Sequence, residues 1–319
     1  MSSKKSANIL DPLYYKSVQR ARYKPLINIL TKWEWIKLMQ LKSAYRQFRE
    51  EGYIIYPEVF KGKELEQLLV ACNSSLEQYT EAWDLEKPNT DFEVMRHLNN
   101  PRWHRDNQEY LTTIMEKIAD PRCLGPVEQI FAGPSLFRCT SYFINHRFTS
   151  HDGGWHRDSQ FMCSSDEEER RMLDQIRQSD FNDNAGIQFQ IALIDNDDIE
   201  YVPYSANRHD SPEEAYIRLA DNKSHNQEDG MPNAMRIPLK AGDAVIFNPY
   251  GLHRGRYHKD IPRRTLMLTY TRSTSVQFDY FSNQPWCAEP DYLNGLSPRA
   301  TAYFQQFINA YHGFWESSK

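Results

Sequence analysis

Two histidines and one aspartate have the residue types and spacing of a metal site. His156 and Asp158 lie two positions apart, at the end of the segment Gly-Gly-Trp-His-Arg-Asp. Side chains alternate along an extended chain, so this imidazole and this carboxylate point to the same side. They can bind one metal ion from one face, and a third ligand must come from a distant segment. His253, after a Pro-Tyr-Gly turn, is the best candidate.

The residues that follow His253 suggest what else the site binds. Two histidines and one carboxylate, with other coordination positions open, are typical of non-heme Fe(II) oxygenases. Gly255 permits close approach of the backbone to a ligand. Arg264, eleven residues after His253, opens an apolar strand, and a buried guanidinium needs an anionic partner such as a dicarboxylate co-substrate. His258, the rival third ligand, lies in a charged turn and is expected to be exposed.

The motif itself is weak evidence, because Trp-His-Arg-Asp occurs at both 103–106 and 155–158. Asp106 is followed by Glu109 and an apolar helical periodicity, which is typical of a helix N-terminus. The first copy is therefore interpreted as a helix cap. The second copy follows a Gly-Gly turn and lies between predicted strands, so the local context favours it as the metal pair.

Composition limits the function classes. The chain has 319 residues, a formal net charge of −5 and five scattered cysteines without C-x-x-C spacing. The mildly acidic balance lacks the basic footprint of nucleic-acid binding. The cysteine pattern argues against a disulfide framework and fits a reducing cytosol. Neither a secretory signal nor a membrane-spanning run is evident, so we expect a cytoplasmic protein without nucleic-acid or membrane partners.

Hydrophobic patterning indicates which elements position the site. A helix ending near Gly52 precedes a short strand, and further helices are predicted at 64–76, 107–119 and 127–131. Short strands separated by turns indicate a sandwich or barrel rather than an alternating βαβ sheet. These strands are predicted at 136–144, 187–194, 235–238, 244–247 and 265–271.

We expect a single domain over residues 1–319. Residues 159–185 begin with acidic side chains typical of a helix N-terminus and directly follow two ligands, so they form either a lid or a solvated surface helix. The basic, aromatic N-terminus is either a helix packed outside the fold, which is favoured, or a membrane-surface helix. The expected parts are an N-terminal extension (1–44), a helical portion (45–133), a β core (134–272) and a C-terminal extension (273–319).

Taken in order, the motifs between Tyr45 and Arg272 resemble the phytanoyl-CoA dioxygenase-like (PhyH) family of Fe(II)/2-oxoglutarate-dependent oxygenases. The resemblance rests on Phe-Arg-Glu-Glu-Gly-Tyr-Ile-Ile-Tyr-Pro at 48–57, Leu-Glu-Gln-Leu-Leu at 65–69, Trp-His-Arg-Asp at 155–158, Val-Pro-Tyr-Ser-Ala-Asn-Arg at 202–208, Ala-Gly-Asp-Ala-Val-Ile-Phe at 241–247, and the spacing from His253 to Arg264.

The resemblance implies a mainly β fold with flanking helices and a double-stranded β-helix (jelly-roll, cupin-like) core. It implies that His156, Asp158 and His253 bind Fe(II) and perform catalysis with O2. Arg264 then binds the distal carboxylate of the co-substrate 2-oxoglutarate, with Arg263 as the alternative. The other candidates for contact with the co-substrate are Gly255, Asn145, Tyr142 and Gln190.

Two departures from the family concern details of the co-substrate site. Members often carry a hydroxyl side chain where this chain has Gly255, and residues 204–207 replace the family's Gly-Ser-His turn. Gln188 and Gln190 share one face of a strand, and period two does not show which face is inward. By family position, Gln190 lines the pocket.

The expected function is hydroxylation, desaturation or demethylation of a C–H bond in a small metabolite or natural-product intermediate, with release of succinate and CO2. Asp158 favours these reactions over halogenation, because related halogenases have a small residue there. The alternatives are an oxygen-independent cupin-like metal isomerase or hydrolase, and a catalytically inactive binding module. The basic cluster of Arg254, Arg256, Lys259 and Arg263 either attracts an anionic substrate or is solvated. The primary substrate and the oligomeric state are left open.

Overall fold

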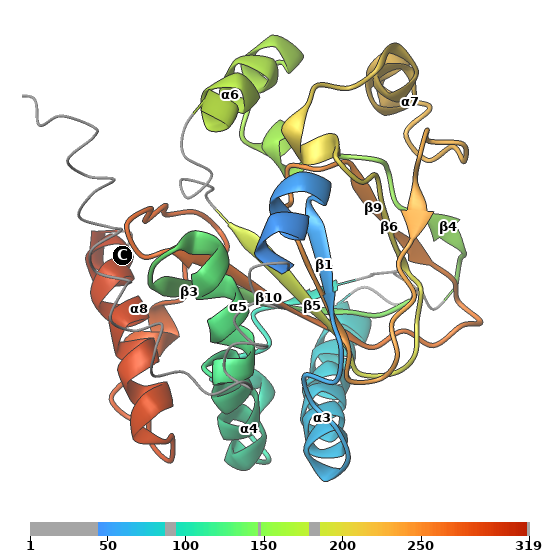
Figure 1. The fold of residues 1–319 in the computed structure, drawn as a ribbon. Helices are drawn as coiled ribbons and strands as arrows, with labels where there is room; N and C mark the ends of the chain where they lie inside the picture. The colour runs from blue at the N-terminus through green and yellow to red at the C-terminus, as the bar shows by residue number, and fades with distance from the viewer. Residues whose placement is uncertain (1–43, 87–93, 146–147, 179–185, 318–319) are drawn as a thin grey trace, which may run out of the picture. The chain divides into compact units, whose positions relative to one another are not determined.

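The computed structural model has two antiparallel sheets with helices around them (Figure 1). It describes residues 44–86, 94–145, 148–178 and 186–317. Contacts divide the chain into Met1–Ala44 and Tyr45–Lys319, and all that follows concerns the second unit. The helix predicted in the N-terminal extension lies outside the described residues.

The larger sheet has six strands. Their order is β1 (Tyr53–Tyr56), β8 (Ala244–Phe247), β5 (Ile187–Ala192), β10 (Thr265–Arg272), β3 (Ser135–Phe143) and β2 (Val94–Arg96). Every residue of β8 is buried, and so is every residue of β10 except Arg272. Apolar and β-branched side chains fill both faces of these central strands, which is why they read as continuous hydrophobic runs.

The smaller sheet has four short strands, and it contains one of the candidate ligands. Their order is β4 (His151–Asp152), β9 (His253–Tyr257), β6 (Ile199–Tyr201) and β7 (Met235–Arg236). A buried cluster joins the two sheets, since it includes Val245 and Phe247 from the larger sheet and Ile199 and Tyr201 from the smaller one. The core therefore lies between the sheets, and His253 stands at its edge in β9.

Helices cover the larger sheet on one side. α3 (Lys63–Glu86), α4 (Gln108–Ile118), α5 (Pro121–Phe131) and α8 (Pro298–Ser317) lie in the lower half of Figure 1, with α5 and α8 packed on β3. α6 (Asp166–Gln178) and α7 (Pro212–Lys223) lie at the top of the same view. Within the described ranges, each helix is too short or too polar to cross a membrane.

The structure confirms the predicted strands to within about two residues at their ends, and it confirms the helix expected at 107–119. The predictions were wrong at two helices. The helix expected at 127–131 begins at Pro121, because Asp120 accepts a hydrogen bond from the amide of Arg122 and proline is favoured at the first helical position. The helix expected at 64–76 continues to Glu86.

Several elements were not predicted at all. β6 and β9 are three and five residues long, and β9 mixes a histidine, a glycine and two arginines, so it has no apolar alternation. α8 lies in what was expected to be a C-terminal extension. Its apolar side chains, including Phe304, Phe307 and Tyr311, are buried. The C-terminal part is therefore an integral layer of this unit.

Candidate metal centre and its pocket

The structure brings His156, Asp158 and His253 together. One possible ligand atom from each lies within 4.8 Å of the other two. Nε2 of His156 and Nε2 of His253 are each 3.6 Å from Oδ1 of Asp158. The imidazole rings have centroids 4.2 Å apart. Two nitrogens and one carboxylate oxygen thus face a common point, and they form the one group of three such residues found among the described ranges.

Backbone hydrogen bonds between two distant segments produce this convergence. The amide of His156 donates to the carbonyl of His253 (3.1 Å), and the amide of His253 donates back to the carbonyl of His156 (3.0 Å). This antiparallel bridge places the two histidines directly opposite each other. The amide of Asp158 donates to the carbonyl of Pro249 at 2.8 Å, which fixes the third ligand against the same turn.

Each histidine is oriented by a glycine carbonyl two residues earlier. Nδ1–H of His156 donates to Gly154 at 2.7 Å, and Nδ1–H of His253 donates to Gly251 at 2.9 Å. A carbonyl oxygen only accepts, so both rings carry their proton on Nδ1 and direct an unprotonated Nε2 at the common point. Neither glycine leaves room for a side chain. A Cβ at Gly154 would lie 2.6 Å from the side-chain nitrogen of Asn226, and a Cβ at Gly251 would overlap the hydroxyl of Tyr201.

Asp158 is held by a side chain from the larger sheet. Nε2 of Gln188 donates to Oδ2 of Asp158 at 2.6 Å, which leaves Oδ1 directed at the two histidines. Burial raises the pKa of Asp158. Burial also lowers the pKa of His253 far below its usual value. The neutral imidazole is the form that binds a metal.

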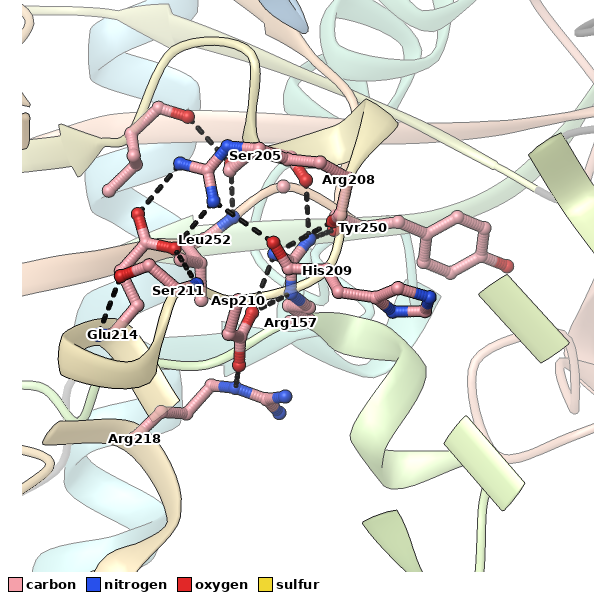
Figure 2. A network of polar contacts seen from close by, with 12 residues as sticks. Arg157, Ser205, Arg208, His209, Asp210, Ser211, Glu214, Arg218, Tyr250 and Leu252 are labelled. Atoms are coloured by element: carbon pink, nitrogen blue, oxygen red, sulfur yellow. Dashed lines mark hydrogen bonds and ion pairs between the residues drawn. The ribbon is translucent and has the colours of Figure 1, made fainter. Parts of the chain in front are cut away.

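Arg157, which lies between the two candidate ligands in sequence, belongs to a buried network of polar contacts (Figure 2). Its guanidinium donates to Oδ1 of Asp210 at 2.9 and 2.7 Å, and to the carbonyls of Ser205 (2.8 Å) and Tyr250 (2.5 Å). The side chain of Arg157 is fully buried. Burial acts to raise the pKa of Asp210, but the guanidinium groups of Arg157 and Arg218 hold it below its ordinary value.

The same network continues to the segment after the ligands. Figure 2 shows Arg218 donating to Asp210, at 2.7 Å, and Arg218 also pairs with Glu169 of α6 at 2.9 Å. Glu169 accepts a hydrogen bond of 2.5 Å from the hydroxyl of Ser159, the residue after Asp158. A chain of alternating charges therefore ties the ligand segment, α6 and α7 together.

A cavity of about 560 Å³ opens onto the three candidate ligands. Phe161 and Met162, from the segment expected to form either a lid or a surface helix, line it and are themselves well exposed. The ring of Phe161 lies 5.6 Å from that of His156. The part of that segment at 179–185 lies outside the described residues, and its role as a lid stays a prediction.

The structure separates the two candidate arginines for the co-substrate. Arg263 is 1% exposed and lines the cavity, whereas Arg264 is not among the lining residues. The guanidinium of Arg264 donates to Asn73 at 2.9 Å and to the carbonyl of Arg263 at 2.7 Å. Because Arg264 immediately precedes β10, the alternation of side chains turns these two neighbours to opposite sides.

Arg263 has few polar contacts for a buried guanidinium. Its Nε has no hydrogen-bond partner among the described residues but forms an ion pair with Oδ2 of the buried Asp198 at 3.6 Å, and its Nη1 donates to the carbonyl of Arg256 at 3.3 Å. The guanidinium lies between the rings of Phe143 and Tyr257, 5.1 and 5.2 Å from their centroids. A Cβ at Gly255 would stand 2.7 Å from the hydroxyl of Tyr257 and 3.3 Å from Nη1 of Arg263, so this space is kept clear of side-chain atoms by the glycine.

The remaining sequence-predicted residues divide into two groups. Gly255 and Gln190 line the cavity, and Oε1 of Gln190 is buried without a hydrogen-bond partner in the described part of the chain. Asn145 and Tyr142 do not line it. The side-chain amide of Asn145 donates to the carbonyl of Ile261, and the hydroxyl of Tyr142 donates to Asn73 at 2.9 Å.

The basic cluster predicted near His253 is largely neutralised. Arg254 pairs with Glu200 and with Asp229 at 2.6 Å. Arg256 pairs with Asp152 at 2.9 Å and with Glu200 at 3.1 Å. Arg254 also packs on the indole ring of Trp155, 4.8 Å from its centroid. These two arginines stabilise the packing of the smaller sheet and offer little charge for a ligand.

Sequence reasoning missed one wall of the cavity. Arg96 of β2 and Arg138 of β3 line it, and so do residues 279–281. The C-terminal location of 279–281 and the shortness of β2 concealed their role. One pattern that the prediction did not use was visible in the sequence, namely the Gly-x-His triplet that ends at each of the two candidate ligand histidines.

Both the sequence and the fold of this chain are similar to those of known proteins. A family model described as phytanoyl-CoA dioxygenase (PhyH) matches residues 48–264. No curated protein sequence matches the chain. Among solved structures, AviO1 from Streptomyces viridochromogenes Tue57 is similar, with a TM-score of 0.52, 15% identity, and coverage of 75% of this chain and 97% of that chain.

EctD from S. alaskensis is similar to the same degree. The structure with bound Fe has a TM-score of 0.52 and 15% identity, and the match covers 74% of this chain and 81% of EctD. The structure with 2-oxoglutarate and 5-hydroxyectoine has a TM-score of 0.50 and 13% identity, with coverage of 74% and 78%. At such low identity, these similarities establish a common fold.

Proposed function

Because the chain belongs to the phytanoyl-CoA dioxygenase (PhyH) family, within the class of non-heme iron, 2-oxoglutarate-dependent oxygenases, we propose that it oxidises a C–H bond of a small organic molecule. The observation that carries this proposal is the convergence of two imidazole Nε2 atoms and one carboxylate oxygen at the cavity. EctD, which has a similar fold, has been solved with Fe and with 2-oxoglutarate. The proposal includes a double-stranded β-helix for the two packed antiparallel sheets.

The donor set suits Fe(II). His156 and His253 both present an unprotonated nitrogen, and Asp158 presents the oxygen that Gln188 leaves unbonded. Two imidazoles and one carboxylate on one face leave the remaining positions of an octahedral ion open. The carboxylate at Asp158 occupies the position that halide ligation requires to be vacant, which supports hydroxylation, desaturation or demethylation rather than halogenation.

The inner end of the cavity suits a dicarboxylate. Arg263 is buried there, and its Nε has no hydrogen-bond partner among the described residues, although Asp198 lies at ion-pair distance. We propose Arg263, rather than Arg264, as the residue that binds the distal carboxylate of 2-oxoglutarate. Gly255 provides the space beside Arg263, because any larger residue would contact its guanidinium and the hydroxyl of Tyr257.

Bound iron and 2-oxoglutarate supply the oxidising power, with O2 consumed and succinate and CO2 released. The chain supplies placement. His156, Asp158 and His253 fix one face of the site, Gln188 fixes the carboxylate, and Arg263 orients the co-substrate. Phe143, Ile199, Phe247 and Met267 give the inner cavity an apolar lining that limits access of water.

An anaerobic titration tests the proposal directly. Addition of Fe(II) to the protein with 2-oxoglutarate should produce a visible metal-to-ligand charge-transfer band, and labelled 2-oxoglutarate should release CO2 in air. Absence of the band in metal-loaded, folded protein would contradict the proposal. Release of CO2 without added substrate would rule out an oxygen-independent isomerase or hydrolase, and metal content measured by mass spectrometry would rule out an inactive module.

The assignment of Arg263 has its own test. Arg263→Gln should raise the Kd for 2-oxoglutarate by about 10- to 100-fold, because a charge-assisted hydrogen bond contributes about 1.5–3 kcal/mol. Arg264→Gln is the matched control and should change that Kd by less than about threefold. The reverse ranking would return the co-substrate role to Arg264.

A further inference from the structure

Two arginines on adjacent strands line the cavity from the wall that the 2-oxoglutarate proposal does not use. Arg96 ends β2 and Arg138 lies within β3. Both guanidinium groups lie over the ring of Phe281, 5.2 and 5.1 Å from its centroid.

The two arginines differ in how their charge is balanced. Arg138 forms an ion pair with Asp279, which neutralises it. Arg96 donates one hydrogen bond to the neutral hydroxyl of Ser141, at 2.7 Å, and no carboxylate within the described ranges lies at ion-pair distance. The remaining N–H groups of Arg96 therefore stand at the cavity wall with an unbalanced positive charge.

The wall that carries Arg96 is rigidly built. Nε2–H of His97 donates to the carbonyl of Phe281 at 3.1 Å. Asp279 accepts hydrogen bonds from the amides of Phe281 (3.0 Å) and Ser282 (3.1 Å). His97 has a φ of +56°, which non-glycine residues rarely adopt. This strained residue immediately follows Arg96, and such strain is concentrated at functional sites because the surrounding structure must maintain it.

A second cavity lies next to the cavity of the metal centre. It has a volume of about 300 Å³ and shares Arg96 and Tyr280 with the cavity of the metal centre. Its other walls are aromatic, amide and basic, including Tyr79, Arg102 and Trp286. Arg96 therefore lies between two neighbouring cavities.

We propose, on the basis of the function proposed above, that the primary substrate is an organic anion whose carboxylate or phosphate group pairs with Arg96. The carbon to be oxidised then lies toward His156 and Asp158, and the rest of a larger molecule extends into the second cavity. A planar guanidinium that is stacked on an aromatic ring, and that has no counter-ion in the described part of the chain, is well suited to bind an oxyanion through paired hydrogen bonds. Arg96 is thus a specificity-determining residue.

Matched probes test this proposal before the substrate is known. Benzoate, phenyl phosphate and neutral benzamide are titrated calorimetrically into the protein loaded with Ni(II) and saturating 2-oxoglutarate, so that the inner dicarboxylate site is filled. At least one of the two anions should bind about tenfold more tightly than benzamide. Whether benzoate or phenyl phosphate binds better distinguishes a carboxylate from a phosphate substrate.

Variants connect that preference to Arg96. Arg96→Gln should weaken binding of the preferred anion by about tenfold and leave benzamide unchanged, and Arg96→Lys should retain part of the preference. Arg105→Gln is the control, because Arg105 is exposed. Thermal unfolding identifies any variant that fails to fold, and the lysine variant then carries the test.

Failure of this inference is distinguishable from failure of the proposed function. Equal affinities of the wild-type protein for anions and benzamide, or an unchanged preference in Arg96→Gln, would overturn the inference. The charge-transfer band with Fe(II) and 2-oxoglutarate is recorded on the same samples. A normal band without anion preference rejects only the role of Arg96, whereas absence of the band rejects the proposed function and with it the inference.

Discussion

At 103–106 and 155–158 the same four residues have different partners. His104 is 2% exposed, and its Nε2–H donates to the carbonyl of Leu98 at 2.7 Å. At the second copy it is Nδ1 of His156 that donates, to Gly154 at 2.7 Å, so that Nε2 is left for a metal. The distribution of protons on the ring, which the backbone acceptor determines, makes one histidine structural and the other a potential ligand.

The arginine and the aspartate of the two copies also differ in their surroundings. Arg105 and Asp106 are exposed. Arg157 is completely buried against Asp210, and Asp158 faces the two histidines. The helix after the first copy is capped by Asn107, whose Oδ1 accepts from the amide of Glu109 at 3.0 Å, so the expected capping role of Asp106 is wrong. Residues distant in sequence, rather than the motif, determine what each copy does.

The largest expected effect comes from removing each histidine in turn. His156→Ala should abolish the charge-transfer band with Fe(II) and 2-oxoglutarate and lower turnover by about 10³-fold or more, because one of three protein ligands is lost. His104→Ala should leave the band intact and lower the free energy of unfolding by about 1–3 kcal/mol, because it leaves the Leu98 carbonyl without its buried donor. Anaerobic spectra and urea unfolding measure the two effects separately.

Loss of the band in His104→Ala protein that is demonstrably folded would reverse the assignment of the two copies. A normal band in His156→Ala would place the metal elsewhere. Both variants are compared at the same protein and metal concentrations, since apparent affinity depends on them.

The arginines of the two Trp-His-Arg-Asp copies, Arg105 and Arg157, provide the second contrast. Arg157→Leu should lower the free energy of unfolding by about 3–5 kcal/mol, because it removes one partner of a buried ion pair and leaves the carbonyls of Ser205 and Tyr250 unbonded. Arg105→Leu, on the surface, should change it by no more than about 0.5 kcal/mol. Urea unfolding of both variants measures the difference. Equal effects would mean that the network in Figure 2 adds nothing to stability.

Much of the site was predictable because its signals are local. A histidine and an aspartate at period two, a distant histidine after a turn, and the pair of arginines before an apolar strand are all visible in the sequence. The predicted strands of the larger sheet were confirmed because β8 and β10 are buried on both faces and therefore read as continuous apolar runs.

What could not be predicted depends on side-chain direction and on contacts between distant residues. The proposal of Arg263 over Arg264 rests on which of the two neighbours lines the cavity, and a spacing of eleven residues from His253 does not contain that information. Gln188 reaches Asp158 from another strand, and Phe281 reaches the cavity from the C-terminal part. Such contacts follow from strand register, which depends on the whole fold.

The third contrast is between the two aspartates. The side chain of Gln188 orients Asp158, whereas Asp106 is exposed. Gln188→Ala should lower the affinity for Fe(II) by about 10- to 100-fold, because it removes the hydrogen bond that directs Oδ1 at the histidines. Asp106→Asn should not change that affinity. Competition with a chelator of known strength measures it, and an unchanged affinity in Gln188→Ala would show that the backbone alone orients Asp158.

The smallest expected effect is a pH dependence of stability that belongs to the first copy. Burial lowers the pKa of His104, although its hydrogen bond to Leu98 opposes this, so the folded state keeps a neutral ring that the unfolded chain protonates below a pKa of about 6.5. The unfolded state then binds more protons, and stability must fall as the pH drops below that value.

In His104→Gln this contribution is absent. The difference in free energy of unfolding between wild type and His104→Gln, measured in urea at pH 7.5 and 5.5, should therefore shrink by up to about 1 kcal/mol at the lower pH. Titration of carboxylates common to both proteins cancels in the difference, and a difference that stays constant with pH would mean that folding does not change the pKa of His104.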